Sequence, residues 1–196
     1  MNAPEDLKIE RRKKRTPRKV TAKYLDNAAL YYLSRFATSA ENLRRVMMRK
    51  IQLSAKHHGT SIDDGADLLD SMIQRYLNFG LLDDPAYAKT RAASLHRRGN
   101  SARVITGKLK QNGVGSDDIA AAIDALRDDL DDGEDPEFTA ALTLARKRRF
   151  GPFGLEKPGE EKRTKQLAAL ARAGFSYGIA KRIINADDEE DLEHPY

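Results

Sequence analysis

Signals that begin and end helices recur along this chain at spacings of 51 to 62 residues, and this recurrence is the feature that most constrains its fold. A shift of 62 residues superposes Ser39-Ala40 on Ser101-Ala102, and a shift of 61 superposes Gly113 on Gly174. A shift of 51 superposes Asp84-Pro85 on Asp135-Pro136. Repeats of this length are typical of arrays built from one small supersecondary unit. We therefore expect three divergent copies of a three-helix unit.

The apolar residues between these signals follow the helical period. Leu43, Met47 and Ile51 fall on one face of a helix that Ser39 caps, and no segment alternates as a strand does. The fold class is therefore all-α, with about nine helices. A unit of some 50 residues buries little apolar surface alone, so we expect the units to stack into an elongated, curved array. The expected boundaries are a disordered basic tail over 1–20, units over 21–82, 83–133 and 134–186, and an acidic tail over 187–196.

Charge alternates along the sequence with a similar spacing. Residues 35–58, 89–110 and 146–182 carry net charges of +5, +7 and +8, whereas 63–84, 117–137 and 187–193 carry −5, −9 and −6. Ordinary solvated helix faces would explain part of this pattern. Stacked units would instead join their basic parts into one track that suits a phosphate backbone.

Composition excludes several classes of protein. The chain has no cysteine, so it has no disulfide framework, thiolate metal site or cysteine nucleophile. No apolar run approaches the length needed to span a membrane, and the first residues do not form a secretory signal. We find no catalytic constellation, cofactor motif or metal-ligand spacing. The sequence thus predicts a cytoplasmic, monomeric protein that is not an enzyme and needs no cofactor or metal.

The candidate binding residues are cations that recur at matching places in the units. Those at helix ends are Arg35, Arg97, Arg98, Arg148 and Arg149, and those on second helices are Arg45, Arg49, Arg103, Lys110, Lys162 and Lys165. A second anion-binding set lies in the tail: Arg11, Arg12, Lys13, Lys14, Arg15, Arg18 and Lys19. Phe36, Tyr76, Tyr87 and Phe138 are expected in the core, and the histidines, including His96, in solvent.

Several segments resemble the RecX family of bacterial recombination regulators. They include Ala29-Leu30-Tyr31-Tyr32-Leu33-Ser34-Arg35, Gly80-Leu81-Leu82-Asp83-Asp84-Pro85-Ala86-Tyr87-Ala88 and Gly174-Phe175-Ser176-Tyr177. The resemblance covers about residues 24–186 in the same order. It implies tandem three-helix repeats and binding to the RecA filament on single-stranded DNA. It further implies reduced ATPase, strand-exchange and coprotease activity of that filament, in the regulation of DNA repair, recombination and the SOS response, with no catalytic residue.

The basic patches also fit a second function. A stand-alone regulator of the helix-turn-helix kind would insert one second helix into the major groove and use the basic tail as an arm. It would bind duplex DNA with a sequence preference. The filament regulator would bind single-stranded DNA itself only weakly and without sequence preference.

Overall fold

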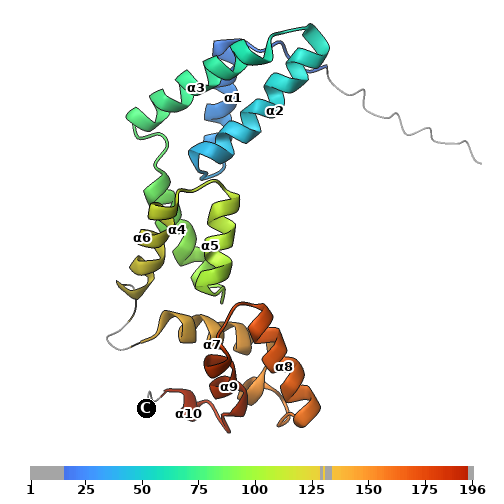
Figure 1. Ribbon diagram of the computed structural model, residues 1–196, viewed down its shortest axis with the longest axis vertical. Coiled ribbons are helices and arrows are strands. Elements are labelled where there is room, and N and C mark those ends of the chain that lie inside the picture. Colours follow the sequence, from blue (N-terminus) through green and yellow to red (C-terminus); the bar gives the residue numbers. More distant parts are fainter. Residues whose placement is uncertain (1–15, 129, 131–133, 194–196) are drawn as a thin grey trace, which may run out of the picture.

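The computed structural model describes residues 16–128, 130 and 134–193, and these residues contain helices but no strand. Figure 1 shows them as three groups stacked along one long axis, which confirms the predicted tandem all-α array. The helices are α1 (Ala22–Leu33), α2 (Ala40–His58), α3 (Ile62–Asn78), α4 (Asp84–His96), α5 (Ala102–Gln111), α6 (Ser116–Asp128), α7 (Pro136–Arg148), α8 (Glu160–Arg172), α9 (Tyr177–Asn185) and α10 (Glu190–Glu193), with a 3₁₀ turn η1 (Gly151–Phe153).

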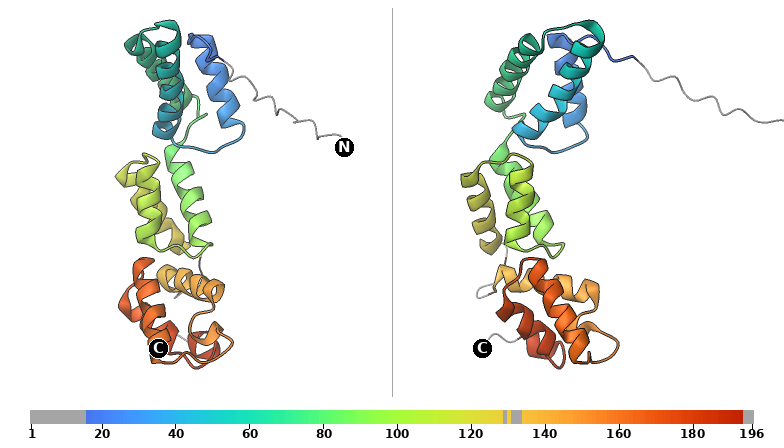
Figure 2. Two further views of the ribbon diagram at one scale, coloured as in Figure 1. Left: turned by 90° about the vertical axis from the view of Figure 1, so that its right-hand side faces the viewer. Right: turned by 45° about the vertical axis from the view of Figure 1, so that its right-hand side comes forward.

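Each group encloses its own hydrophobic cluster, and Figure 2 shows the groups separated along the axis. The cluster of α1–α3 includes Leu43, Met47 and Ile51, the apolar face predicted for α2. Ile105 and Leu109 lie at the centre of the second cluster. The third cluster relies on small alanines of α7 with apolar residues of α8 and α9. The array thus has three small cores, and the contacts between units must fix how the units are stacked.

Serine caps four of the helix starts, including the predicted cap Ser39 and its repeat Ser101. The hydroxyls of Ser39, Ser61, Ser101 and Ser176 each accept a hydrogen bond from the amide three residues later. The pair Asp84-Pro85 predicts Asp84 as the cap of α4, but the structure places the cap one residue earlier, at Asp83. The carboxylate of Asp84 instead accepts a hydrogen bond from Ala40 of the first unit.

Two residues lie in environments that differ from those predicted. Phe36 was expected in the core, but its side chain is 54% exposed and packs on the ring of Tyr32, with the ring centroids 5.1 Å apart. His96 was expected in solvent, but it is buried, and its Nε2 lies 2.7 Å from the carbonyl oxygen of Pro136. A carbonyl only accepts hydrogen bonds, so this Nε2 carries the proton. Both residues lie beside contacts between units, which helical periodicity does not report.

Parts of both expected tails pack against the array. The amide of Val20 donates to Ser54 Oγ at 2.9 Å, and the carbonyl of Pro17 lies 2.7 Å from His58 Nε2. At the other end α10 buries Leu192 in the third cluster. The basic residues from Arg11 to Arg15 lie outside the described residues, whereas Arg18 and Lys19 are exposed.

Candidate functional site

The second helices of the three units follow one another end to end. α2, α5 and α8 lie one below another along the same side of the array in Figure 1. The amino end of α2 meets the carboxyl end of α5, and the amino end of α5 meets the carboxyl end of α8. Each contact brings the positive end of one helix dipole to the negative end of another, which is favourable. We call this row the helix column, made of residues 40–58, 102–111 and 160–172.

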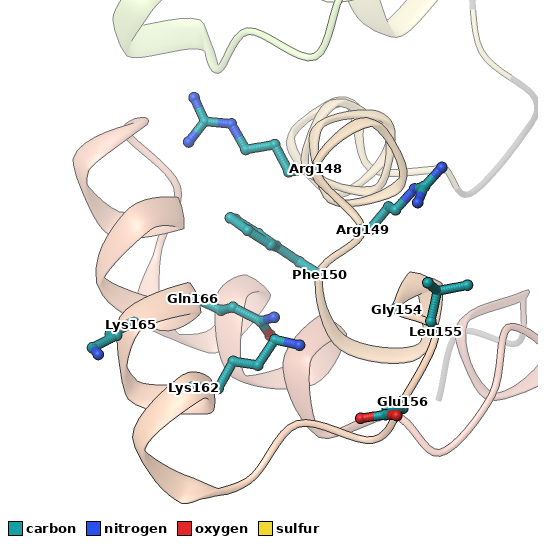
Figure 3. A pocket seen from close by; sticks show the side chains of 9 residues that line it. All are labelled: Arg148, Arg149, Phe150, Gly154, Leu155, Glu156, Lys162, Lys165 and Gln166. Carbon is teal, nitrogen blue, oxygen red and sulfur yellow. The ribbon is translucent and has the colours of Figure 1, made fainter.

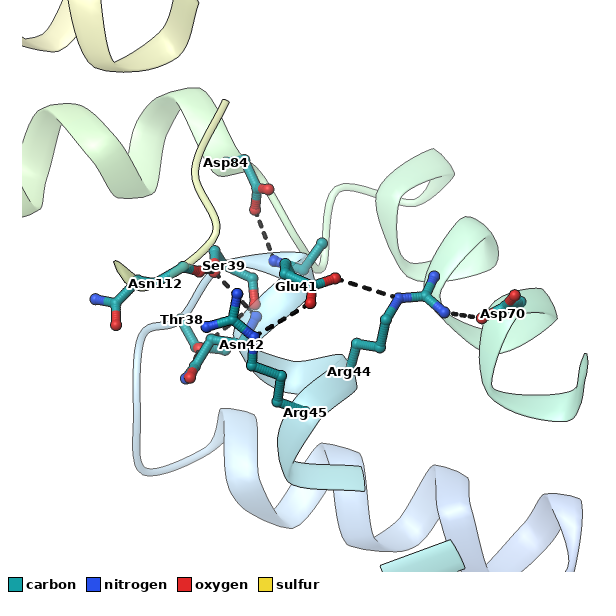
Figure 4. A network of polar contacts seen from close by, with 10 residues as sticks. Thr38, Ser39, Glu41, Asn42, Arg44, Arg45, Asp70, Asp84 and Asn112 are labelled. Atoms are coloured by element: carbon teal, nitrogen blue, oxygen red, sulfur yellow. Dashed lines mark hydrogen bonds and ion pairs between the residues drawn. The ribbon is translucent and has the colours of Figure 1, made fainter. Parts of the chain in front are cut away.

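The first junction of the helix column joins α2 to the second unit. The Oγ of Ser39, besides capping its own helix, donates to the backbone oxygen of Asn112. The amide of Ala40 donates to a carboxylate oxygen of Asp84 at 2.8 Å, as Figure 4 shows. Burial raises the pKa of Asp84, and the hydrogen bond from Ala40 partly offsets this rise. A start signal of α4 thus also satisfies a free amide of α2.

The second junction repeats the first with an equivalent serine, whereas its carboxylate comes from Glu137, which does not correspond to Asp84 in the repeat. The Oγ of Ser101 donates to the backbone oxygen of Ala173 at 2.7 Å, and the amide of Ala102 donates to the carboxylate of Glu137. Gly174 has φ +101°, and a Cβ on it would overlap the Ser101 hydroxyl. The repeated serines and glycines therefore serve the stacking of units as well as the ends of helices.

Two of the predicted binding cations span the junctions. Arg45 Nη1 donates to the carbonyl of Gln111 at 2.6 Å, and Arg103 Nη2 donates to the carbonyl of Arg172 at 3.2 Å. A guanidinium at the carboxyl end of a helix satisfies free carbonyls and complements the dipole. Sequence reasoning missed this role because a shift of 62 residues places Arg103 on Glu41 and not on Arg45. These two arginines are therefore structural as well as cationic.

The remaining predicted cations are exposed on the array. Arg49, Lys110, Lys162 and Lys165 lie along the helix column, whereas the others follow the first helices of their units: Arg35, Arg97, Arg98, Arg148 and Arg149. In the described part of the chain, Lys165 has an ion-pair partner, Glu161 at 2.6 Å. An exposed pair of this kind is weak. Their arrangement as one continuous track stays a prediction.

A cavity of about 590 Å³ lies where the two kinds of cation meet in the third unit. Arg148 and Arg149 come from the end of α7, and Lys162 and Lys165 come from α8. Figure 3 shows the ring of Phe150 between Arg148 on one side and Lys162 on the other. Sequence analysis did not select Phe150, because the sequence pattern does not distinguish an aromatic residue after the end of a helix from an ordinary core residue.

A second cavity of about 690 Å³ lies between the first two units. Its lining includes the exposed Phe36, together with Tyr32, Tyr87 and Arg91. Arg35 also lines it and holds its guanidinium 4.6 Å from the ring centroid of Tyr31, a cation–π contact. The charge of Arg35 is thus kept at the surface beside an aromatic cluster.

Neither a metal site nor a spanning helix is found in the described ranges. No group of three or more potential ligand side chains comes together there. No helix among these residues has the length and apolar character to cross a membrane.

Comparison with known proteins decides the family. Residues 83–123 match the family model described as "RecX, second three-helix domain". The chain is 44% identical to the regulatory protein RecX of Myxococcus xanthus (strain DK1622) over 185 residues, which cover 93% of this chain and 95% of that protein. The chain belongs to the RecX family of regulatory proteins. More distant RecX proteins match as well: that of Agrobacterium fabrum is 31% identical over 84% of this chain and 83% of its own length, and that of Thermobifida fusca is 29% identical over 76% of both.

Membership in the RecX family fits the architecture. The segment that matches the family model begins at Asp83, the cap of α4, and continues into α6. The family is one of regulators and not of enzymes. The resemblance drawn from the sequence is therefore confirmed, and the function to explain is regulation in DNA repair and recombination.

Proposed function

We propose that this chain binds the RecA filament on single-stranded DNA and lowers its ATPase, strand-exchange and coprotease activities. The observation that carries the proposal is the helix column, in a member of the RecX family, with exposed cations in all three units. A filament presents the same anionic groups at regular intervals, so several weak contacts act together. Any regulation of ATP hydrolysis is then exerted on the partner.

The junctions support this proposal because they fix the spacing of the cations before binding. Four hydrogen bonds from backbone amides and serines, and two arginine bridges, hold the three units in one geometry. Little conformational freedom is then lost on binding, which raises affinity for a regular partner. A filament held at several protomers resists the rearrangements that its ATPase cycle requires.

The same junctions argue against the helix-turn-helix alternative. A recognition helix contacts bases through its amino-terminal residues. The amino ends of α2 and α5 are covered by the next unit, through Ser39 and Ser101. The amino end of α8 begins with Glu160 and Glu161, which phosphates repel. None of the three second helices therefore has an amino end suited to contact bases in the major groove.

The DNA-dependent ATPase of RecA, measured with stoichiometric added chain, tests the proposal. We expect inhibition and co-sedimentation of the chain with filaments. Absence of both would refute the proposal. A gel shift with random duplex, random single strand and preformed filament at about 150 mM salt separates the alternative, which requires sequence-preferring duplex binding without RecA.

Charge reversal tests the role of the cations at the helix ends. Arg97→Glu with Arg98→Glu should weaken filament binding by about 1–3 kcal/mol, since both side chains are exposed and the fold does not depend on them. The matched control is Arg127→Glu with Lys181→Glu, which makes the same change in net charge on exposed sites of third helices. Equal effects of the two double variants would reduce the role of Arg97 and Arg98 to net charge.

A further inference from the structure

The cavity of the third unit combines an aromatic ring, four cations and a buried amide. Phe150 is half-buried at its wall, and the cations are Arg148, Arg149, Lys162 and Lys165. Its one acidic lining residue is Glu156. The cavity between the first two units, by contrast, has two cations in its lining, Arg35 and Arg91.

Gln166 gives the cavity a fixed polar group. Its side chain is 5% exposed, and its Oε1 accepts a hydrogen bond from the amide of Gly151 at 3.1 Å. That bond sets the orientation of the side-chain amide. The Nε2 donor then lies on the other side of the amide group, and Gln166 is one of the residues that line the cavity.

The backbone that forms the cavity is held in an unfavourable conformation. Arg149 ends α7 with φ +55°, and it is the one non-glycine residue with positive φ in the described ranges. A glycine would adopt this conformation without cost. The turn brings Phe150 and the arginines to the cavity, while Gly151 contacts the backbone of Ile183 too closely for any side chain. The chain therefore keeps a cation where glycine would suit the backbone better.

An aromatic face beside clustered cations is the chemistry that binds single-stranded nucleic acid. Bases stack on aromatic rings regardless of sequence, while lysine and arginine neutralise the flanking phosphates. An amide donor at the floor meets the carbonyl and ring-nitrogen acceptors that every base carries on its edge. A duplex would not expose a base face to Phe150, so the unpaired strand is the matching form.

We propose that this cavity binds one nucleotide of single-stranded DNA, with its base stacked on Phe150, its edge on Gln166 Nε2, and the adjacent phosphates on Arg148, Lys162 and Lys165. The inference deepens the proposed function, because these cations belong to the predicted filament surface. It adds a direct contact with the DNA strand that needs no recombinase.

Tryptophan fluorescence offers a direct test, because the chain has no tryptophan of its own. The variant Phe150→Trp places a single stacking reporter in the cavity. The control Phe79→Trp places one at a 76% exposed position in the first unit. We expect a four-residue oligothymidylate to quench the emission of Phe150→Trp saturably and to leave that of Phe79→Trp unchanged. A matched tetramer of abasic units carries the same phosphates without bases and should not quench.

Several results would overturn the proposal. One is that the oligothymidylate fails to quench Phe150→Trp, or that it quenches the control Phe79→Trp as strongly as Phe150→Trp. Another is that the abasic tetramer quenches Phe150→Trp as strongly as the oligothymidylate does. A further one is that free thymidine monophosphate binds as tightly as the tetramer. The last would assign a mononucleotide site and not a strand site.

A second measurement covers the case in which the introduced indole disturbs the fold. Fluorescence anisotropy of a labelled oligothymidylate tetramer measures its affinity for the unmodified chain and for Phe150→Leu. We expect Phe150→Leu to bind the tetramer about 5-fold or more weakly, because leucine fills the space without a stacking face. Lys162→Gln should make the log–log dependence on salt shallower by about 0.7. Equal affinity for Phe150→Leu would refute stacking. Neither assay contains RecA, so failure here leaves the inhibition of RecA open to its own test.

Discussion

The serine at each junction acts on two units at once, and its removal should cost more than the loss of a helix cap. Ser101 is fully buried; its Oγ accepts from the amide of Val104 at 3.3 Å and donates to the oxygen of Ala173 at 2.7 Å. Loss of the cap costs about 1 kcal/mol. The carbonyl left without its partner in a partly buried place adds about 1–2 kcal/mol. Ser101→Ala should therefore lower the free energy of unfolding by about 2–3 kcal/mol.

Urea denaturation followed by circular dichroism measures this loss. The control is Ser61→Ala, because Ser61 is an exposed cap that accepts from Asp64 and has no bond to another unit in the described part of the chain. It should cost about 1 kcal/mol. Hydrogen exchange at the amide of Val104 should also become faster in Ser101→Ala. If the two alanine variants lose the same stability, the junction bond contributes nothing and the argument for fixed stacking fails.

Four further substitutions test neighbouring parts of the same reasoning. Because burial raises the pKa of Asp84, its carboxyl group binds a proton more tightly in the folded chain than in the unfolded chain, so the free energy of unfolding falls as the pH rises through this pKa. Asp84→Asn keeps an acceptor for the amide of Ala40 and should be at least as stable as the parent at pH 7. Acid titration of both proteins should show that this difference in the free energy of unfolding disappears at low pH. Gly174→Ala should cost at least about 2 kcal/mol through its φ of +101° and its close junction contact, whereas Gly107→Ala, which meets open space within α5, should gain up to about 1 kcal/mol in thermal melts. Arg149→Gly should raise stability by about 0.5–1 kcal/mol and weaken binding of single-stranded DNA; a loss of stability would contradict the strain argument.

Local signals in the sequence were sufficient for the helices and their repetition. Serine caps at residues 39, 61, 101 and 176, and glycines in the left-handed region after α2, α5 and α8, are set by the backbone within a few residues. Such signals need no tertiary structure to be read. The expected unit boundaries stay predictions, although the buried residues of each hydrophobic cluster fall within one of the expected ranges, apart from Leu192.

Contacts between units could not be predicted in the same way. The pairing of Ser39 with Asn112 joins residues 73 positions apart, and no periodicity reports which face of one unit meets the next. For the same reason, Arg45 was expected to bind a partner, whereas it bridges the junction between two units. His96 was expected in solvent, whereas it contacts the carbonyl of Pro136. The cavity at Phe150 depends on a left-handed arginine, which sequence preferences disfavour.

The junction chemistry also explains why α8 starts differently from α2 and α5. The second helices that meet a following unit begin with a serine, whose hydroxyl has a carbonyl to reach. Within residues 16–128, 130 and 134–193 no unit packs on the amino end of α8, and its cap, Gly159, makes no side-chain hydrogen bond. Glu160 and Glu161 complement the dipole of α8 instead and would repel the carboxyl end of another helix. The cation-lined cavity lies beside this amino-terminal part of α8, where Lys162, Lys165 and Gln166 line it.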